Sequence, residues 1–192
     1  MILNTLKNKR IILASGSPRR QEILKSIGVN FEVELRSVDE VFSDKLKHHE
    51  ISDYLAQLKA EQFDDLKPND ILITGDTIVW HQGKALNKPN DEEEAFEMLQ
   101  SLSNTTHEVI SSFCLKTSEK TETFFDSTQV KFKSLSEDEI WHYINNYQPF
   151  DKAGAYGIQE WIGQIGISEI KGSFYTVMGF PIHLVYKKLS EI

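Results

Sequence analysis

Residues 11–28 place a buried strand, a Gly/Ser turn and a helix start in immediate succession, and this order strongly constrains the fold. The apolar run 11–14 predicts a short buried strand. Ser17 suits the N-cap of the helix, Pro18 suits its first position, and Gly28 suits the residue that stops it. A strand, a Gly/Ser turn and a helix N-terminus together form a common phosphate-binding arrangement.

Two arginines, Arg19 and Arg20, follow Pro18 in the first turn of this predicted helix. A helix N-terminus carries partial positive charge, so each uncompensated cation there costs about 0.3–1 kcal/mol. A bound anion would offset that cost. The alternative is a pair of ordinary surface arginines, because arginine is a good helix former. The segment matches neither the P-loop nor the G-x-G-x-x-G pattern.

Strand and helix patterns alternate along the rest of the chain, which predicts an α/β fold with a mixed sheet. We expect strands at 31–38, 71–80, 107–117 and 122–133, and helices at 51–66, 91–102 and 136–147. Residues 118–121 predict a hairpin turn between the last two strands. We expect the Gly-rich stretch 154–172 to be mostly loop and a terminal helix to open at Pro181. The 192 residues are expected to form a single domain, 1–192.

The net charge of −8 argues against a general binder of nucleic acids or membrane surfaces. The one cysteine, Cys114, has no partner for an internal disulfide, and we expect a buried structural thiol. We recognise no signal peptide and no apolar run of membrane-spanning length. The sequence is therefore expected to be that of a cytoplasmic protein.

Charged residues that could take part in binding or catalysis lie near the ends of the predicted elements. Asp76 follows the apolar run 71–74, where open α/β sheets bind ligands, although a turn-forming Asp is the alternative. Lys59 and Lys88 could contact phosphate or simply be solvated. Glu40 follows the second predicted strand, where solubility is its simplest role. Together they offer cations for a triphosphate and carboxylates for a hard divalent metal.

Seven segments, in order along the chain, resemble the Maf family of nucleoside triphosphate pyrophosphatases. They read LASGSPRRQEIL, VDE, LAQLKA, GDTIV, GKALNKP, DKAGAYGIQ and GSFYTVMGFPI, and they span residues 13–182. The resemblance implies an inosine-triphosphatase-like fold, with a long, twisted mixed sheet flanked by helices around a central cleft. It also implies cleavage of a nucleoside triphosphate between the α- and β-phosphates, with a divalent metal cation (Mg²⁺ or Mn²⁺) as cofactor.

The resemblance also implies a role for each matched position. Asp76 corresponds to the proton acceptor for water, and Glu40 and Asp76 to the metal site. The phosphate-contacting positions correspond to Ser15, Ser17, Arg20, Lys59 and Lys88. The positions that set substrate specificity correspond to Arg19, Thr77 and Gln159.

Within the family, those three specificity positions resemble the branch that hydrolyses dTTP and UTP in a nucleotide-pool house-cleaning role, with modified pyrimidine nucleotides as further candidates. The alternatives are a 7-methyl-GTP pyrophosphatase and a non-catalytic nucleotide-binding regulator of septum formation. Gly75 and Thr176 depart from the family, which more commonly has Ala and Asn there. The resemblance further suggests a homodimer.

Overall fold

The structure, a computed structural model, describes residues 6–192. These residues form two compact units built from interleaved segments of the chain. The first unit contains the described residues up to Asp76, together with 111–126 and 179–192. The second unit contains residues 77–110 and 127–178.

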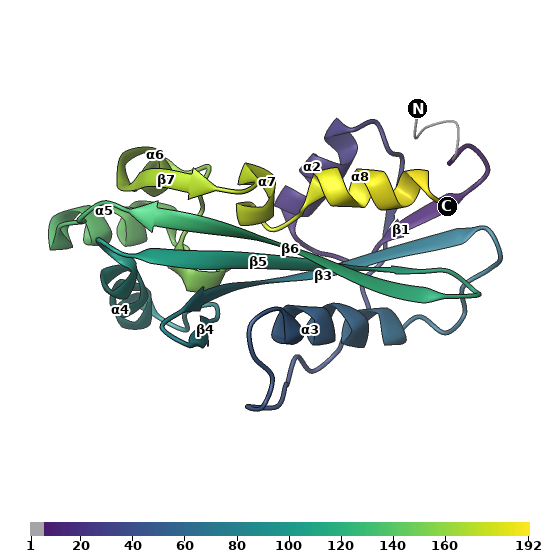
Figure 1. Cartoon of the computed structure of the whole chain (residues 1–192), viewed down its shortest axis with the longest axis horizontal. Helices are drawn as coiled ribbons and strands as arrows, with labels where there is room; N and C mark the ends of the chain where they lie inside the picture. The colour runs from purple at the N-terminus through teal and green to yellow at the C-terminus, as the bar shows by residue number, and fades with distance from the viewer. Residues whose placement is uncertain (1–5) are drawn as a thin grey trace. The chain divides into compact units, whose positions relative to one another are not determined.

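Seven strands form one mixed sheet within residues 6–192, in the order β2-β1-β3-β5-β6-β7, with β4 paired to β3. The strands are β1 Arg10–Leu13, β2 Glu32–Val33, β3 Asp70–His81, β4 Lys84–Leu86, β5 Thr106–Lys116, β6 Thr121–Phe132 and β7 Ile167–Lys171 (Figure 1). The helices are α2 Pro18–Ser26, α3 His49–Glu61, α4 Glu92–Leu102, α5 Glu137–Tyr147, the short 3₁₀ helix η1 Ala153–Ala155, α6 Trp161–Gly166, α7 Phe174–Val177 and α8 Ile182–Ser190. The predicted α/β class with a mixed sheet is confirmed.

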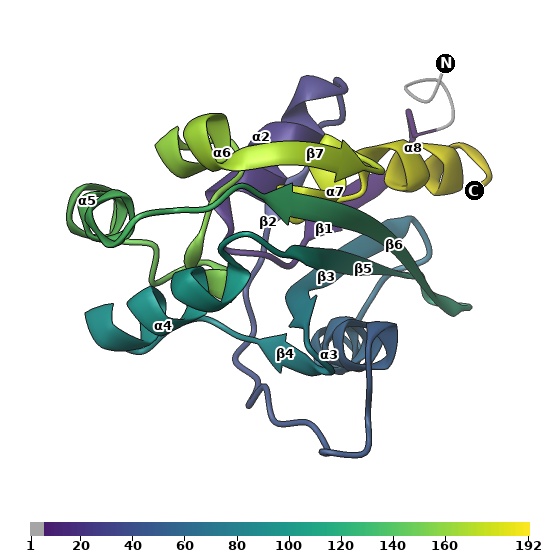
Figure 2. The ribbon, with the colours of Figure 1, turned by 60° about the vertical axis from the view of Figure 1, so that its left-hand side comes forward.

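In the first unit, β1 runs parallel to both β2 and β3. Helices α2 and α8 lie on one face of these strands and α3 lies on the other (Figures 1 and 2). The core on the α3 side contains apolar residues of the strands, of α3 and of the segment just after α3. They are Ile12, Ala56, Ala60, Phe63, Leu72 and Cys114. Burial raises the pKa of the Cys114 thiol, as expected for a structural cysteine.

The second predicted strand, 31–38, is wrong beyond its first residues. Only Glu32 and Val33 pair, opposite Ile12 and Leu13, because the partner strand β1 ends there. The Glu34 amide still donates to the Leu13 carbonyl at 3.3 Å, and beyond it side-chain contacts tie the chain to the rest of the unit.

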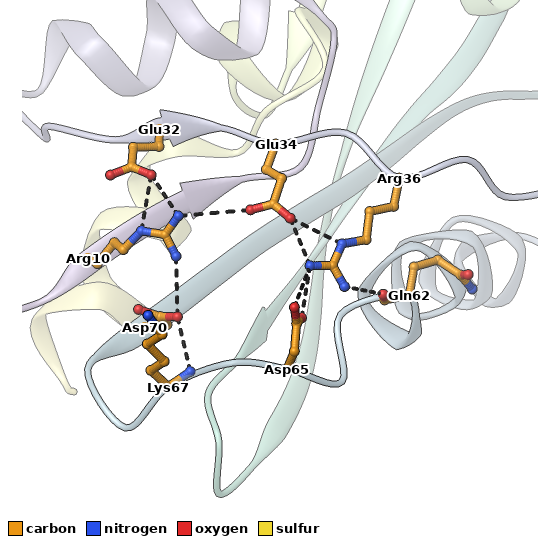
Figure 3. Close-up of polar contacts among 8 residues, drawn as sticks. All are labelled: Arg10, Glu32, Glu34, Arg36, Gln62, Asp65, Lys67 and Asp70. Carbon is orange, nitrogen blue, oxygen red and sulfur yellow. Dashed lines mark hydrogen bonds and ion pairs between the residues drawn. The ribbon is translucent and has the colours of Figure 1, made fainter.

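Two arginines form ion pairs along this edge of the first unit (Figure 3). Arg10 Nη2 lies 2.7 Å from Glu32 Oε2. Arg36 Nη2 lies 2.8 Å from Glu34 Oε1, and Arg36 Nη1 donates to the Gln62 carbonyl at 2.8 Å. The Arg10–Glu32 and Arg36–Gln62 contacts cannot be read from a strand-like residue pattern, since they join segments distant in sequence.

In the second unit, the helices α4 and α5 begin where the sequence predicts. The Asp91 side chain accepts a hydrogen bond from the Glu94 amide at 2.8 Å and caps α4. Ser136 and Glu139 form the expected capping box of α5. Capping is a local interaction, which explains why these boundaries are predictable.

The stretch 154–172 contains more regular secondary structure than predicted, since it includes most of η1 and all of α6 and β7. Two of its glycines serve close packing. A Cβ at Gly163 would lie 2.0 Å from the Ile158 carbonyl oxygen, and one at Gly166 would lie 3.0 Å from the Phe132 ring. These glycines therefore accommodate a tightly packed helix instead of marking a loop.

Other boundaries also differ from prediction. Helix α3 ends at Glu61, five residues before the predicted end, and Phe63 beyond it packs in the core. The short helix α7 was not predicted. Pro181 is the N-cap of α8 rather than its first helical residue. No helix within residues 6–192 is long and apolar enough to cross a membrane.

His107 is a buried neutral side chain in the second unit. Its ring stacks on Phe132, and its Nε2 lies 2.7 Å from the Tyr156 hydroxyl. Burial, with a smaller contribution from His81, lowers the pKa of His107 to about 3. The folded protein therefore resists protonation at a pH where the unfolded chain accepts a proton.

The free energy of unfolding should consequently fall as the pH drops below about 6.5 and continue to fall toward about 3. Well above pH 6.5 both states hold His107 neutral, so it makes no pH-dependent contribution there. Between pH 6.5 and 4.5 the loss should be about 2–3 kcal/mol. Urea unfolding at several pH values measures this loss in the wild type and in His107→Gln. His183→Gln, a substitution of an exposed histidine, is the control. An equal slope of stability against pH in wild type and His107→Gln would contradict this assignment.

Candidate functional site

Asp76 lies on β3 in the first unit and is only 8% exposed. Its Oδ1 lies 2.8 Å from the ammonium nitrogen of Lys59, which comes from the last turn of α3. The same nitrogen lies 3.2 Å from Glu40 Oε1. Two carboxylates distant in sequence therefore share a single ammonium group.

The packing of α3 on β3 brings Lys59 and Asp76 together. The Thr74 hydroxyl, two residues before Asp76, donates to the Ala56 carbonyl at 2.6 Å. Ala56 lies three residues before Lys59 on the helix. Since residues three apart share a helix face, this buried hydrogen bond fixes the face that carries Lys59 against the strand that carries Asp76.

Arg20 points back from α2 toward β3 and the start of the C-terminal segment. Its Nε donates to the Gly179 carbonyl at 2.9 Å. Its Nη1 donates to the Gly75 carbonyl at 2.8 Å and to Ser15 Oγ at 3.2 Å. Burial lowers the pKa of Arg20, while the charge of Asp76 acts in the opposite direction.

These contacts bear on the arginines in the first turn of α2. Three protein oxygen atoms receive hydrogen bonds from the Arg20 guanidinium, so its position at the positive helix end is compensated within the protein. The expected N-cap and first helical residue are confirmed, as Ser17 and Pro18 hold those positions. The Ser17 side chain forms no capping hydrogen bond, and the Ser17 amide donates instead to Ser15 Oγ at 3.3 Å.

Gly75 leaves little space for a larger residue beside this site. A Cβ there would lie 3.0 Å from the Ser112 carbonyl oxygen and 3.7 Å from Arg20 Cζ. An alanine at this position would need the neighbouring backbone to shift by a few tenths of an ångström. The departure from the more common Ala therefore matches the close approach of Ser112 in this chain.

The structure thus brings together Ser15, Arg20, Glu40, Lys59 and Asp76 in the first unit, with Ser17 and Arg19 on the adjoining turn and helix. The remaining candidates belong to the second unit. Thr77 directly follows Asp76, Lys88 is exposed before α4, and Gln159 lies in the segment before α6.

Glu40 and Asp76 supply the carboxylate oxygen atoms that hard cations prefer as ligands. Magnesium is commonly bound by one or two carboxylates together with substrate phosphates and water. Within the described residues, no group of three or more His, Cys, Asp or Glu side chains could hold a metal on its own. Two carboxylates converging on one point therefore fit a cation that arrives with a phosphate-bearing ligand, and do not form a closed structural metal site.

The Gly179 and Gly75 carbonyl groups that bind Arg20 are not predicted from the sequence. Both residues lie in segments that resemble the family, GSFYTVMGFPI and GDTIV. Gly179 also has a positive φ of 97°, which favours glycine. The sequence signal was therefore present, but its partner could not be identified without the fold.

The model of the Maf-like protein family matches residues 10–192. The dTTP/UTP pyrophosphatase of Flavobacterium psychrophilum is 56% identical over 187 residues, covering 97% of this chain and 96% of that protein. The dTTP/UTP pyrophosphatases of Flavobacterium johnsoniae and Bacteroides fragilis are 51% and 47% identical to this chain. Each match covers 100% of this chain and 100% of the relative.

Solved structures of other proteins share the mixed-sheet fold of this chain. The Ham1 protein of Staphylococcus aureus matches with a TM-score of 0.54 at 16% identity, covering 95% of this chain and 99% of that one. A HAM1 protein from Coxiella burnetii matches with a TM-score of 0.52 at 13% identity, covering 96% and 100%. At these identities the likeness concerns the fold alone.

Arg20→Lys should destabilise the protein by about 1–3 kcal/mol, because one ammonium cannot span the three acceptors that the guanidinium binds. Thermal and urea unfolding measure the change. Arg10→Lys is the matched control, since Arg10 is an exposed ion-pairing arginine of the same unit and should change stability little. Equal stability of the Arg20 and Arg10 variants would show that the three contacts do not anchor α2.

Proposed function

This chain belongs to the Maf-like protein family, and we propose that it is a nucleoside triphosphate pyrophosphatase that hydrolyses dTTP and UTP. The observation that carries the proposal is its similarity, at 45–56% identity over nearly the full length, to relatives named dTTP/UTP pyrophosphatase. The products would be the nucleoside monophosphate and pyrophosphate. The charged cluster around Asp76 provides groups suited to this reaction.

Asp76 is proposed as the base. Its carboxylate would accept a proton from the attacking water as the water oxygen bonds to phosphorus and the α–β bridge breaks. Lys59, 2.8 Å away, holds Asp76 Oδ1 in place and brings positive charge to the site. In phosphoryl transfer, positioning and charge stabilisation supply most of the rate enhancement.

The phosphates would be bound by cations and polar groups from several elements. Arg20, Lys59 and Lys88 supply positive charge, and Ser15 and Ser17 supply hydrogen-bonding groups on the turn before α2. Arg20 would contribute mainly its positive charge, because its Nε and Nη1 already donate to protein oxygen atoms. The Ser15–Arg20 hydrogen bond would hold this turn in place before the phosphates bind.

We propose Glu40 and Asp76 as the carboxylates for a divalent cation, Mg²⁺ or Mn²⁺. When bound, the cation supplies charge neutralisation for the phosphates. Both carboxylates face the Lys59 ammonium group, so the cation would either replace that group between them or bind their other oxygen atoms. Cation binding would also give a function to the half-exposed side chain of Glu40.

Arg19, Thr77 and Gln159 are proposed to select the base. Uracil and thymine present two carbonyl acceptors on either side of the N3–H donor. An amide and a hydroxyl can supply donors and an acceptor, and arginine supplies donors. Cytosine has an amino group in place of O4 and no hydrogen on N3, so it would leave groups unpaired.

We further propose a cytoplasmic homodimer with a nucleotide-pool role. The dimer and the location come from the family resemblance and from the composition. The acidic net charge of −8 favours a small substrate held by a local basic cluster over a nucleic acid partner.

Hydrolysis of UTP in the presence of Mg²⁺ or Mn²⁺ should release UMP and pyrophosphate in equal amounts. Ion-exchange chromatography or ³¹P NMR identifies these products. Chelation with EDTA should abolish the reaction and added metal should restore it. Release of UDP with orthophosphate would place cleavage at the wrong bond, and activity that survives EDTA would remove the metal from the proposal.

Asp76→Asn should lower kcat by about 10²–10⁴-fold while the protein stays folded, since it keeps the side-chain shape but removes the basic oxygen. Circular dichroism and thermal unfolding check the fold. Asp64→Asn, a substitution at an exposed loop position of the same unit, should keep full activity. A near-normal rate in Asp76→Asn would move the base elsewhere, with Glu40 the next candidate.

UTP and dTTP should have kcat/KM values at least about tenfold above those of CTP and 7-methyl-GTP, because each unpaired buried polar group costs about 1–3 kcal/mol. Gln159→Ala should reduce the UTP-to-CTP ratio. Gln164→Ala, at an exposed position of α6, should not change it. A wild-type preference for 7-methyl-GTP would contradict the proposed substrates, and an unchanged ratio in Gln159→Ala would remove Gln159 from base selection.

A further inference from the structure

Gln159 carries a buried acceptor without a partner. Its side-chain Oε1 is inaccessible to solvent and has no hydrogen-bond partner within residues 6–192. Buried polar atoms in folded proteins are nearly always paired, so each exception needs an explanation. A ligand that brings an N–H donor to this oxygen would supply the missing hydrogen bond.

The backbone around Gln159 forms a closely held turn, residues 157–160. The Glu160 amide donates to the Gly157 carbonyl at 3.0 Å. The Gly157 amide donates to the Tyr143 hydroxyl at 3.0 Å, and that hydroxyl donates in turn to Glu160 Oε2. Tyr143 therefore links both ends of the turn, and Gln159 lies between them.

Lys152 holds the same carboxylate from the other side. Its ammonium lies 3.2 Å from Glu160 Oε1 and 2.6 Å from Asp151 Oδ1. The side chain is only 9% exposed, and a buried cation is costly unless it is paired. The charge pair therefore fixes the Glu160 side chain, which already receives the hydrogen bond from Tyr143.

Gly157 makes this arrangement possible. A Cβ there would lie 2.8 Å from Glu160 Cδ and 2.9 Å from Gln159 Nε2. Both side chains fold back over the glycine backbone, in the space that any other residue would occupy. The amide of Gln159 is thus held against the same backbone that Tyr143 and Glu160 hold in place.

We propose that Tyr143, Lys152 and Glu160 are positioning residues that hold the 157–160 turn so that Gln159 Oε1 accepts the N3–H of a uracil or thymine base. This inference rests on the proposed function, since it concerns how that enzyme selects its base. An acceptor held at this point favours uracil and thymine, which carry a hydrogen on N3. It opposes cytosine, whose N3 is itself an acceptor.

The Tyr143 hydroxyl is suited to this role because it donates and accepts at once. Burial raises the pKa of Tyr143 well above its ordinary value, and the hydrogen bond to Glu160 acts in the same direction. The hydroxyl consequently stays protonated throughout the working pH range. It therefore keeps the proton that it donates to Glu160 while it accepts a hydrogen bond from the Gly157 amide.

Tyr143→Phe tests the proposal, since it keeps the ring and removes the hydroxyl. The UTP-to-CTP ratio of kcat/KM should fall by about tenfold, the scale of one misplaced hydrogen bond, through a higher KM for UTP with kcat nearly unchanged. Tyr147→Phe is the matched control. Tyr147 stacks on Tyr143 from the next turn of α5, and its substitution should leave the ratio unchanged.

Glu160→Gln provides a second variant, in case Tyr143→Phe folds poorly. It keeps the shape and an acceptor for Tyr143 but removes the charge that Lys152 binds, so it should lower the ratio as well. Kd values for UMP and CMP, measured by calorimetry, separate base recognition from the chemical step. The preference for UMP should weaken in both variants.

The outcomes separate this inference from the proposed function. A wild type that does not hydrolyse UTP overturns both. A wild type that prefers UTP, with variants that keep the full UTP-to-CTP ratio, overturns the inference alone. Equal losses for UTP and CTP together with a lower Tm would show that the network only stabilises the fold, and would also overturn it.

Discussion

A single ammonium group shared by two carboxylates is the interaction on which the candidate site depends. Lys59 lies 2.8 Å from Asp76 Oδ1 and 3.2 Å from Glu40 Oε1. Without that charge, neither contact would have its counter-ion, and the two like charges would repel each other. Lys59 thus allows an acidic chain to concentrate the negative charges that a base and a cation site both require.

The backbone supports this cluster through buried hydrogen bonds. The Thr74 hydroxyl joins β3 to α3 at the Ala56 carbonyl, and Arg20 joins α2 to the Gly75 and Gly179 carbonyls. These contacts connect the two residues before Asp76 to helices on opposite faces of the sheet (Figure 1). The position of the Asp76 carboxylate is therefore determined by tertiary packing on both sides of β3, which is the condition for a preorganised site.

Features that depend on neighbours in sequence were predictable. The strand β3, the Asp91 cap of α4 and the capping box of α5 follow from local pattern and capping chemistry. Features that depend on distant partners were not. β2 is short because β1 is short, and the Gly-rich segment before β7 is helical because Gly163 and Gly166 permit close packing.

The same distinction applies to the site. The residues were identified from motifs, but the pairing of Lys59 with both Asp76 and Glu40 could not be, since the three are brought together only by the fold. The proposed role of Tyr143 and Glu160 in positioning Gln159 also depends on the packing of α5 against the 157–160 turn. Motif matching finds candidate site residues more readily than the residues that hold them in position.

A double-mutant cycle on Lys59 and Asp76 tests the central claim most directly. The measurement is kcat/KM for UTP in Lys59→Met, Asp76→Asn and the double variant, with each fold checked by thermal unfolding. If the two residues act as one unit, the double variant should be within about threefold of Asp76→Asn alone, because groups that act together are strongly non-additive. Losses that multiply in the double variant would contradict the account.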